Sequence, residues 1–252
     1  MKLTLIEKRI FLFSCIIACV FALPQTASAM HIMEGYLPLA HCIVWGVICL
    51  PFLVLGVIRI RRTLETNKRI LMLLAMSGAF IFVISSLKIP SVTGSCSHMT
   101  GTGLASILFG VTTASILGII VLVFQAILLA HGGLTSLGAN TFSMAIAGPL
   151  FTWLIYKLGL KLKINRRVTI FFAAMLGDIF TYCVTSIQLA LAYPSESGGI
   201  LTSAVKFLGV FAPTQIPLAI VEGILTVLII IGLESFANPE LKAIGYLEES
   251  AA

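Results

Sequence analysis

Met30-His31 offers the donors of a planar metal chelate once a peptidase removes the residues before it. The α-amine of Met30 and the amide nitrogen of His31 would close a five-membered ring, and that amide nitrogen and the imidazole Nδ1 would close a six-membered one. An α-amine has a pKa of about 8, so a metal ion displaces its proton readily at neutral pH. Planar nitrogen donors suit Ni(II) and Cu(II) and can hold Co(II) where the site enforces the geometry, whereas zinc prefers a tetrahedron.

The fourth corner of this plane requires an imidazole from another part of the chain, and His98 is our candidate. It lies in a polar stretch, residues 91–103, whose glycines let the backbone bend and approach closely. We therefore expect Met30, His31 and His98 to bind the metal. His41 lies near the start of an apolar run, where an interfacial role is expected instead.

Other polar side chains are candidates for supporting roles. Glu34 is expected to cap or orient the N-terminal segment. Asp178 and Glu222 lie inside apolar runs, where carboxylates are functional candidates. They could pair with a neighbouring subunit, form a helix contact or relay charge, and the sequence leaves the choice open. The residues expected to support the ligands are Cys96, Ser97, Gln125, His131 and Asn140, of which Cys96 and His131 could also reach the metal.

Residues 1–29 have the three parts of a secretory signal peptide. Three basic residues precede an apolar run at 10–23, and Ala27-Ser28-Ala29 forms a cleavage site. Cleavage after Ala29 would leave Met30 as a free N-terminus outside the cytoplasm. The alternative is an uncleaved first transmembrane helix, for which the apolar run is short.

The composition is that of a membrane protein. Apolar residues make up 59% of the chain and charged residues 10%, whereas a soluble domain carries about 25% charged residues. The net charge of +6 comes from Lys and Arg clusters between apolar runs. The positive-inside rule explains these clusters, so they do not indicate nucleic acid. The six cysteines lie mostly in apolar runs without a C-x-x-C pair, and we interpret them as small apolar residues.

The apolar runs predict an all-α integral membrane protein. Two basic clusters, at 59–69 and 157–167, should both be cytoplasmic, so the chain must cross the membrane an even number of times between them. The apolar stretch 103–130, interrupted at Gly110, must then form two short helices or a re-entrant pair. We expect about seven membrane segments in the mature chain, with the C-terminus inside. The other spans are expected near 40–58, 70–88, 140–157, 168–192 and 212–233.

This topology places three of the four histidines on the outer face. His31 lies in the N-terminal segment, His98 in the predicted loop 88–102 and His131 in the predicted loop 131–140; a further outer loop is expected at 193–209. The expected organisation is a signal peptide at 1–29, a polytopic membrane domain at 30–235 and a short cytoplasmic tail at 236–252.

An intramembrane metalloenzyme and a sensor or assembly protein are the alternatives to a metal-capture protein. An intramembrane metalloenzyme would be expected to carry His-Glu-x-x-His or a pair of aspartates, but the chain has neither, since Asp178 is its only aspartate. A sensor or assembly protein would use the N-terminus only structurally. No Walker Gly-x-x-x-x-Gly-Lys-Ser/Thr loop is present, so ATP hydrolysis would have to come from a partner.

Three segments of the chain show a family pattern. They are Met-His-Ile-Met-Glu-Gly-Tyr-Leu-Pro at 30–38, Ser-His-Met-Thr-Gly-Thr-Gly-Leu at 97–104, and the twenty residues 121–140. Together they resemble the CbiM/NikM family, the substrate-capture subunits of energy-coupling factor importers for cobalt and nickel. The resemblance runs from residue 30 to about residue 235 and is closer to the cobalt-type CbiM members.

The resemblance implies a metal bound by the amine of Met30, the backbone and imidazole nitrogens of His31, and His98. It also implies three kinds of partner: a transmembrane coupling subunit, ATP-binding cassette ATPases and a small accessory membrane subunit. The chain would then be a non-enzymatic, multi-pass protein of a prokaryotic plasma membrane with its mature N-terminus outside. It would capture Co2+ for ATP-driven import and so supply cobalamin synthesis; a nickel-specific subunit is the alternative.

Overall fold

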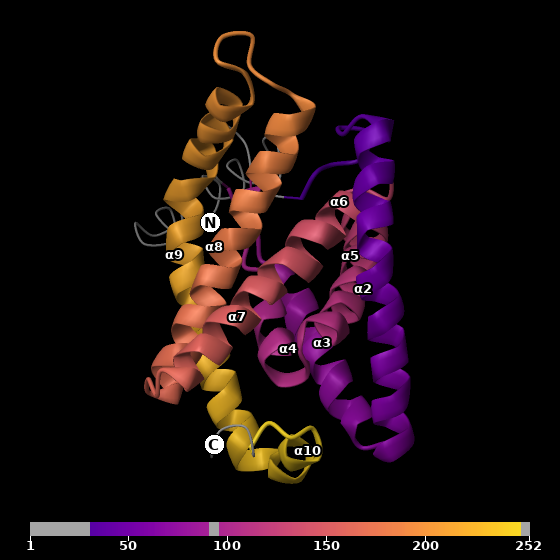
Figure 1. The fold of residues 1–252 in the computed structure, drawn as a ribbon, viewed down its shortest axis with the longest axis vertical. Helices are drawn as coiled ribbons and strands as arrows, with labels where there is room; N and C mark the ends of the chain where they lie inside the picture. Colours follow the sequence, from indigo (N-terminus) through magenta and orange to yellow (C-terminus); the bar gives the residue numbers. More distant parts are fainter. Residues whose placement is uncertain (1–30, 91–95, 248–252) are drawn as a thin grey trace, which may run out of the picture.

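The computed structural model describes residues 31–90 and 96–247 (Figure 1). The predicted signal peptide, Met30 and the last residues of the predicted tail lie outside the described residues. The elements, in chain order, are α2 (Leu39–Thr66), α3 (Ile70–Ser86), β1 (Ile89–Pro90), β2 (Cys96–Ser97), α4 (Thr102–Phe109), α5 (Val111–Leu129), α6 (Leu137–Asn140), η2 (Thr141–Ala147), α7 (Gly148–Lys161), α8 (Arg166–Ala192), α9 (Gly199–Phe236) and α10 (Asn238–Ala243).

The long helices stand side by side, with α2 at one edge of the molecule and the α8–α9 pair at the other (Figure 1). Within the described ranges, five helical segments are long and apolar enough to cross a membrane: Leu39–Thr66, Val111–Leu129, Leu137–Lys161, Arg166–Ala192 and Gly199–Phe236. Helix α3 is apolar but shorter. Large apolar side chains of α2 such as Leu39, Val47 and Val54 point outward, more than half exposed. This chain is therefore an all-α, multi-pass membrane protein.

The predicted break at Gly110 is confirmed. Gly110 has φ 82° and separates α4 from α5. A side chain there would be strained by the positive φ and would approach the guanidinium of Arg59, with a Cβ 3.3 Å from its Nη1. The two helices are unequal: α4 has 8 residues, all of them buried, whereas α5 has 19 and is long enough to span. Buried α4 keeps its ends away from lipid, as an interrupted membrane segment requires.

Two predicted loops are partly helical. The predicted loop 193–209 is wrong beyond residue 198, because α9 begins at Gly199 and continues through Pro213 and Pro217 to Phe236. The polar residues near the start of α9 are compatible with a helix that extends beyond the apolar layer and packs on α8. The Ser203 hydroxyl, for example, donates to the carbonyl of Tyr193, the residue that follows α8 (2.7 Å). The predicted loop 131–140 likewise ends in the helical turn α6.

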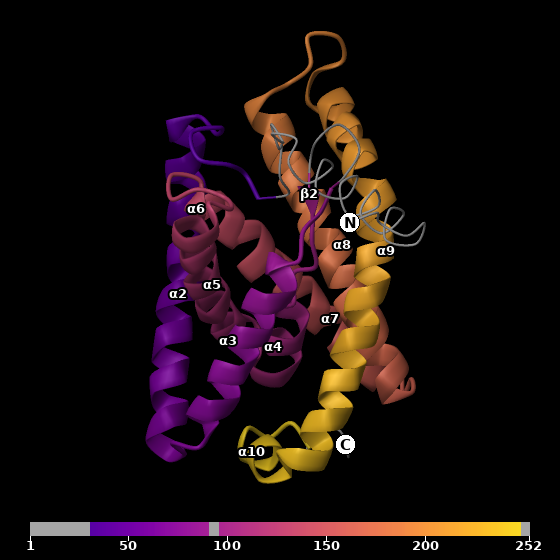
Figure 2. The same cartoon turned by 180° about the vertical axis from the view of Figure 1, so that it is seen from behind.

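The C-terminal segment folds back on the helices instead of extending away from them. Helix α10 is followed by Tyr246, which is buried and stacks on the guanidinium of Arg166 at 4.1 Å from the ring centroid. Arg166 also forms an ion pair with Glu234 at 3.1 Å. These contacts fix the C-terminal end of α9. From there α9 runs along the molecule and past the level of β2 (Figure 2).

Candidate metal centre

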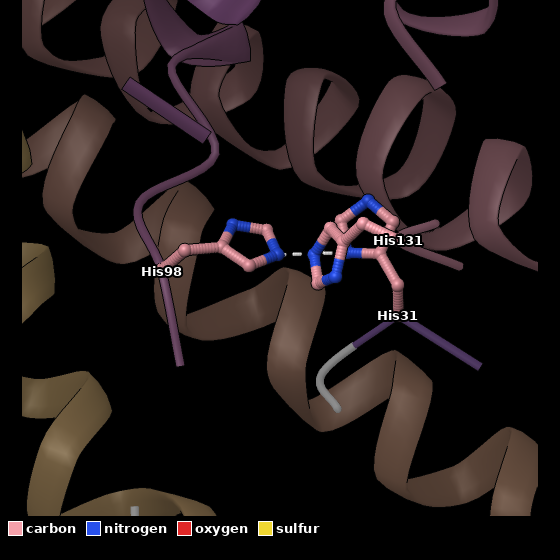
Figure 3. Close-up of side chains that lie close together, drawn as sticks. All are labelled: His31, His98 and His131. Carbon is pink, nitrogen blue, oxygen red and sulfur yellow. Dashed lines mark hydrogen bonds between the residues drawn. The ribbon is translucent and has the colours of Figure 1, made fainter. Parts of the chain in front are cut away.

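Three buried histidines from three separate segments meet at one point (Figure 3). His31 begins the described N-terminal segment, His98 follows β2, and His131 follows α5. One ring nitrogen of each lies within 4.8 Å of those of the other two, and no side chain is more than 3% exposed. A compact cluster of imidazoles is a suitable ligand set for a transition metal.

His31 and His98 contact each other directly. The Nδ1 atom of His31 lies 2.7 Å from the Nε2 atom of His98, and the two nitrogens share a hydrogen bond (Figure 3). The predicted chelate uses the Nδ1 atom of His31, and this is the atom that His98 contacts. The other ring nitrogen of His98 faces the Met99 carbonyl at 2.8 Å. The Nε2 atoms of His31 and His131 are buried and have no hydrogen-bond partner among the described residues.

Burial keeps the three imidazoles neutral. It lowers the pKa of His31 well below its ordinary value, and repulsion by any proton on His131 or His98, and by the Lys88 ammonium, acts in the same direction. Burial lowers the pKa of His98 to about 4 and that of His131 to about 2. A neutral imidazole has a lone pair free for a metal at pH 7. Lys88, which the sequence did not single out, acts on all three rings.

The end of α5 brings His131 into the cluster. Ala130 takes a left-handed conformation (φ 46°), and the backbone N–H of His131 donates to the carbonyl of Gln125 at 3.1 Å. The Gln125 side chain is itself held by a 2.7 Å bond from its Nε2 to Ser85 Oγ. The Gln125 carbonyl therefore accepts a hydrogen bond at the point where α5 ends and the chain turns towards His131.

The segment after α5 also holds the N-terminal segment. Ser136 Oγ donates to the carbonyl of Ile32, and Asn140 bonds both backbone groups of the same residue. A Cβ on Gly133 would lie 2.5 Å from the Cα of Glu34, so only glycine permits this approach. Glu34 accepts hydrogen bonds from the backbone N–H of Thr135 at 3.2 and 3.3 Å, in agreement with the orienting role expected for it.

The segment that carries His98 is bonded on both sides of the histidine. Ser97 Oγ lies 2.8 Å from Thr214 Oγ1 and accepts a hydrogen bond from the Tyr182 hydroxyl at 3.1 Å. Gln215 Nε2 donates to the carbonyl of His98 at 3.1 Å. Ser97 therefore bonds to side chains of α8 and α9 next to His98, and its supporting role at a metal site stays a prediction.

Some candidate residues lie outside the cluster. Met30 is not among the described residues. Cys96 is buried in β2 and His41 is half-buried in α2, and neither belongs to the group of possible ligands. His131, expected as a support, lies as close to the cluster as the two expected ligands.

The two intramembrane carboxylates approach the His98 segment. Glu222 binds Thr100 directly, and Asp178 reaches His98 through Gln215. The sequence did not identify Thr100 or Gln215, because each contact joins residues at least 117 positions apart and polar residues are common in both segments.

Comparison with known proteins identifies the family of this chain and supports the fold. Residues 31–240 match the family described as the cobalt uptake substrate-specific transmembrane region, CbiM. The chain is 65% identical over 239 residues to the cobalt transport protein CbiM of Lachnoclostridium phytofermentans, covering 95% of this chain and 96% of that one. It is 54% identical over 244 residues to CbiM of Chlorobium limicola, covering 97% and 95%.

Solved structures show the same arrangement of helices. The fold is similar to that of a crystal structure described as a truncated transition metal transporter, with a TM-score of 0.71 and 28% identity, covering 81% of this chain and 98% of that one. A second crystal structure, described as a transition metal transporter, matches with the same TM-score and identity. That match covers 81% of this chain and 92% of the other. By family match, sequence identity and fold, this chain belongs to the CbiM family.

Proposed function

We propose that this protein is the metal-capture subunit of an ATP-driven importer for Co2+, with Ni2+ as the alternative cargo. The ligands are the α-amine of Met30, the amide nitrogen and Nδ1 of His31, and Nε2 of His98. The observation that carries the proposal is the 2.7 Å approach of His31 Nδ1 to His98 Nε2 inside a buried group of neutral imidazoles. A metal ion would replace the proton that these two nitrogens share.

His131, the third histidine of the cluster, has a supporting or axial role in this scheme. Its ring centroid lies 4.5 Å from that of His31 and 5.0 Å from that of His98, and its Nε2 has no partner among the described residues. A planar set of four nitrogens leaves axial positions open. His131 is therefore placed to approach the metal from one side of the plane or to exclude water from it.

The proposed function implies a domain organisation, an orientation in the membrane and a set of partners. Residues 1–29 act as a signal peptide, residues 30–235 form the capture domain with seven membrane segments, and residues 236–252 form a cytoplasmic tail. The mature N-terminus and the three histidines face outward from a prokaryotic plasma membrane. Energy comes from a transmembrane coupling subunit and a pair of ATPases, with a small accessory membrane subunit, since the chain has no nucleotide-binding loop of its own.

Cobalt is the preferred cargo because the relatives are described as cobalt transport proteins. Their agreement over nearly the whole chain supports the same substrate and a contribution to cobalamin synthesis. The donor set by itself suits Ni(II) at least as well.

The test is isothermal titration of the purified mature protein with Co2+ and with Ni2+, after its N-terminus has been sequenced. We expect the chain to begin at Met30, to bind one metal ion, and to lose tight binding in His31→Ala. The control His41→Ala alters a half-buried histidine outside the cluster and should bind as the unaltered protein does. A chain that begins at Met1 yet binds metal, or equal affinities of the two variants, would exclude the proposed site.

A further inference from the structure

One helix, α9, holds the segment that carries His98 (Figure 2). Thr214 contacts Ser97 on one side of the histidine, Gln215 binds the carbonyl of His98 itself, and Glu222 binds the residues that follow. The three α9 side chains are spaced over little more than two helical turns. They hold the Ser97 side chain before the proposed ligand and the backbone at and after it.

Glu222 makes the densest of these contacts. Its Oε2 accepts a hydrogen bond from the Thr100 backbone N–H at 2.6 Å, and its Oε1 accepts from Thr100 Oγ1 at 2.9 Å and from the Gly101 N–H at 3.0 Å. Glu222 is 1% exposed, so water does not compete for these donors. Hydrogen bonds to a buried carboxylate are stronger than neutral ones, and a buried donor left without its partner is costly.

Gln215 holds the backbone one step closer to the metal. Its Nε2 donates to the carbonyl of His98 at 3.1 Å and to Asp178 Oδ2 at 2.6 Å. The carbonyl of His98 can only accept a hydrogen bond, so the NH2 end of Gln215 must face it. Gln215 and Asp178 are both almost fully buried.

The contacts of Gln215 and Glu222 end on the backbone of His98, Thr100 and Gly101 and on the Thr100 hydroxyl, and not on the His98 ring. We propose that Gln215 and Glu222 are positioning residues for metal capture, which keep His98 Nε2 directed at His31 Nδ1. This inference rests on the proposed function, because the two residues matter for affinity only if His98 is a ligand.

The isosteric variant Glu222→Gln separates hydrogen bonding from packing. Whichever way the new amide is oriented, its NH2 group faces a donor, Thr100 N–H or the pair Thr100 Oγ1 and Gly101 N–H. Residues that orient metal ligands typically contribute about 10- to 100-fold in metal affinity, and we expect a loss of that size for Co2+. Gln215→Met, which preserves the side-chain volume, is a second variant that carries the test alone if Glu222→Gln is not recovered folded.

The experiment is a double-mutant cycle on the purified mature protein, titrated with Co2+. Glu222→Gln and Gln215→Met are each measured with His98 present and in a His98→Ala background. If they act through His98, their effect should disappear once His98 is gone. Ser106→Ala is the matched control, because Ser106 is buried and its hydroxyl binds the Pro149 carbonyl (2.6 Å) and not the His98 segment.

Cu(II) provides a readout that general destabilisation would not produce. Loss of one equatorial nitrogen moves the visible absorption band of bound Cu(II) to longer wavelength, so Glu222→Gln should shift it in the same direction as His98→Ala does. An unshifted band, or the same loss of Co2+ affinity with and without His98, would refute the positioning role. If the unaltered protein binds neither Co2+ nor Ni2+, the proposed function itself fails, which is a distinct result from binding that is indifferent to Glu222 and Gln215.

Discussion

Asn140 binds both backbone groups of Ile32, the residue that follows His31. Its Oδ1 accepts from the Ile32 N–H at 2.8 Å, and its Nδ2 donates to the Ile32 carbonyl at 3.0 Å. This is the pairing that a neighbouring β-strand would provide, here supplied by one side chain. Because Asn140 is 3% exposed and lies at the end of α6, the N-terminal segment is attached to a rigid part of the fold one residue from the proposed ligand.

Replacing Asn140 should therefore weaken metal binding without removing a ligand. Asn140→Asp keeps an acceptor for the Ile32 N–H but loses the donor to the Ile32 carbonyl, and Asn140→Ala loses both. We expect affinity for Co2+ to fall by about 10- to 100-fold, with Asn140→Ala the weaker binder, as for other residues that orient ligands. Titration calorimetry of the two variants checks the order. Unchanged binding by Asn140→Ala would show that the segment is held by other contacts.

Inserting two glycines between Met30 and His31 should abolish tight binding although every side chain is kept. The fused five- and six-membered rings require the imidazole on the second residue, and the insertion moves it to the fourth. A single glycine is the informative comparison, because an amine, two amides and an imidazole then fill all four corners. That variant should bind Ni2+ whether or not His98 is present. Binding by the two-glycine variant equal to that of the unaltered protein would disprove the N-terminal chelate.

The stability of the metal-free protein should fall as the pH is lowered from 7 to 5. In the unfolded chain these histidines take up protons near their ordinary pKa of about 6.5, whereas in the fold the pKa of His98 is about 4 and that of His131 about 2. Below pH 6.5 the unfolded state thus binds more protons, and stability is lost by up to about 1.4 kcal/mol per pH unit for each such histidine.

Thermal unfolding in detergent, followed by circular dichroism between pH 7 and pH 5, measures this effect. The variant His131→Gln removes one titrating group and should flatten the dependence of the melting temperature on pH. A melting temperature that stays constant from pH 7 to pH 5 in the unaltered protein would contradict neutral, buried histidines.

The parts of the fold and site that follow from local chemistry were predictable. The break at Gly110 follows from an apolar stretch too long for one span, and the proximity of His31 and His98 is expected from the chelate predicted at Met30-His31, which requires a further imidazole. The start of α9 was not predictable, since polar residues near Gly199 resemble a loop until they pack on α8. The cluster position of His131 depends on how α5 ends, and the contact of Glu222 with Thr100 joins residues 122 positions apart. Neither the position of His131 nor the Glu222–Thr100 contact produces a pattern among neighbouring residues of the sequence.

The close contact between α5 and η2 should be as important for the site as the polar contacts. A Cβ on Gly118 would lie 2.4 Å from the Cβ of Ala145 and 3.2 Å from its Cα, and the backbone of η2 cannot yield as a flexible side chain would. Gly118→Ala should therefore separate α5 from η2 and destabilise the protein by roughly 1–3 kcal/mol, the usual cost of overpacking.

Because α5 leads to His131 and η2 follows Asn140, the same substitution should also weaken Co2+ binding. Gly232→Ala is the matched control: it lies inside α9, and a Cβ there would meet no atom within 4 Å. We expect Gly232→Ala to leave the Co2+ affinity unchanged and the melting temperature equal or slightly higher, since alanine favours a helix, while Gly118→Ala lowers both. Equal melting temperatures for the two variants would mean that α5 and η2 can separate without cost. The close packing would then not be what fixes the distance between the two segments that hold the proposed metal site.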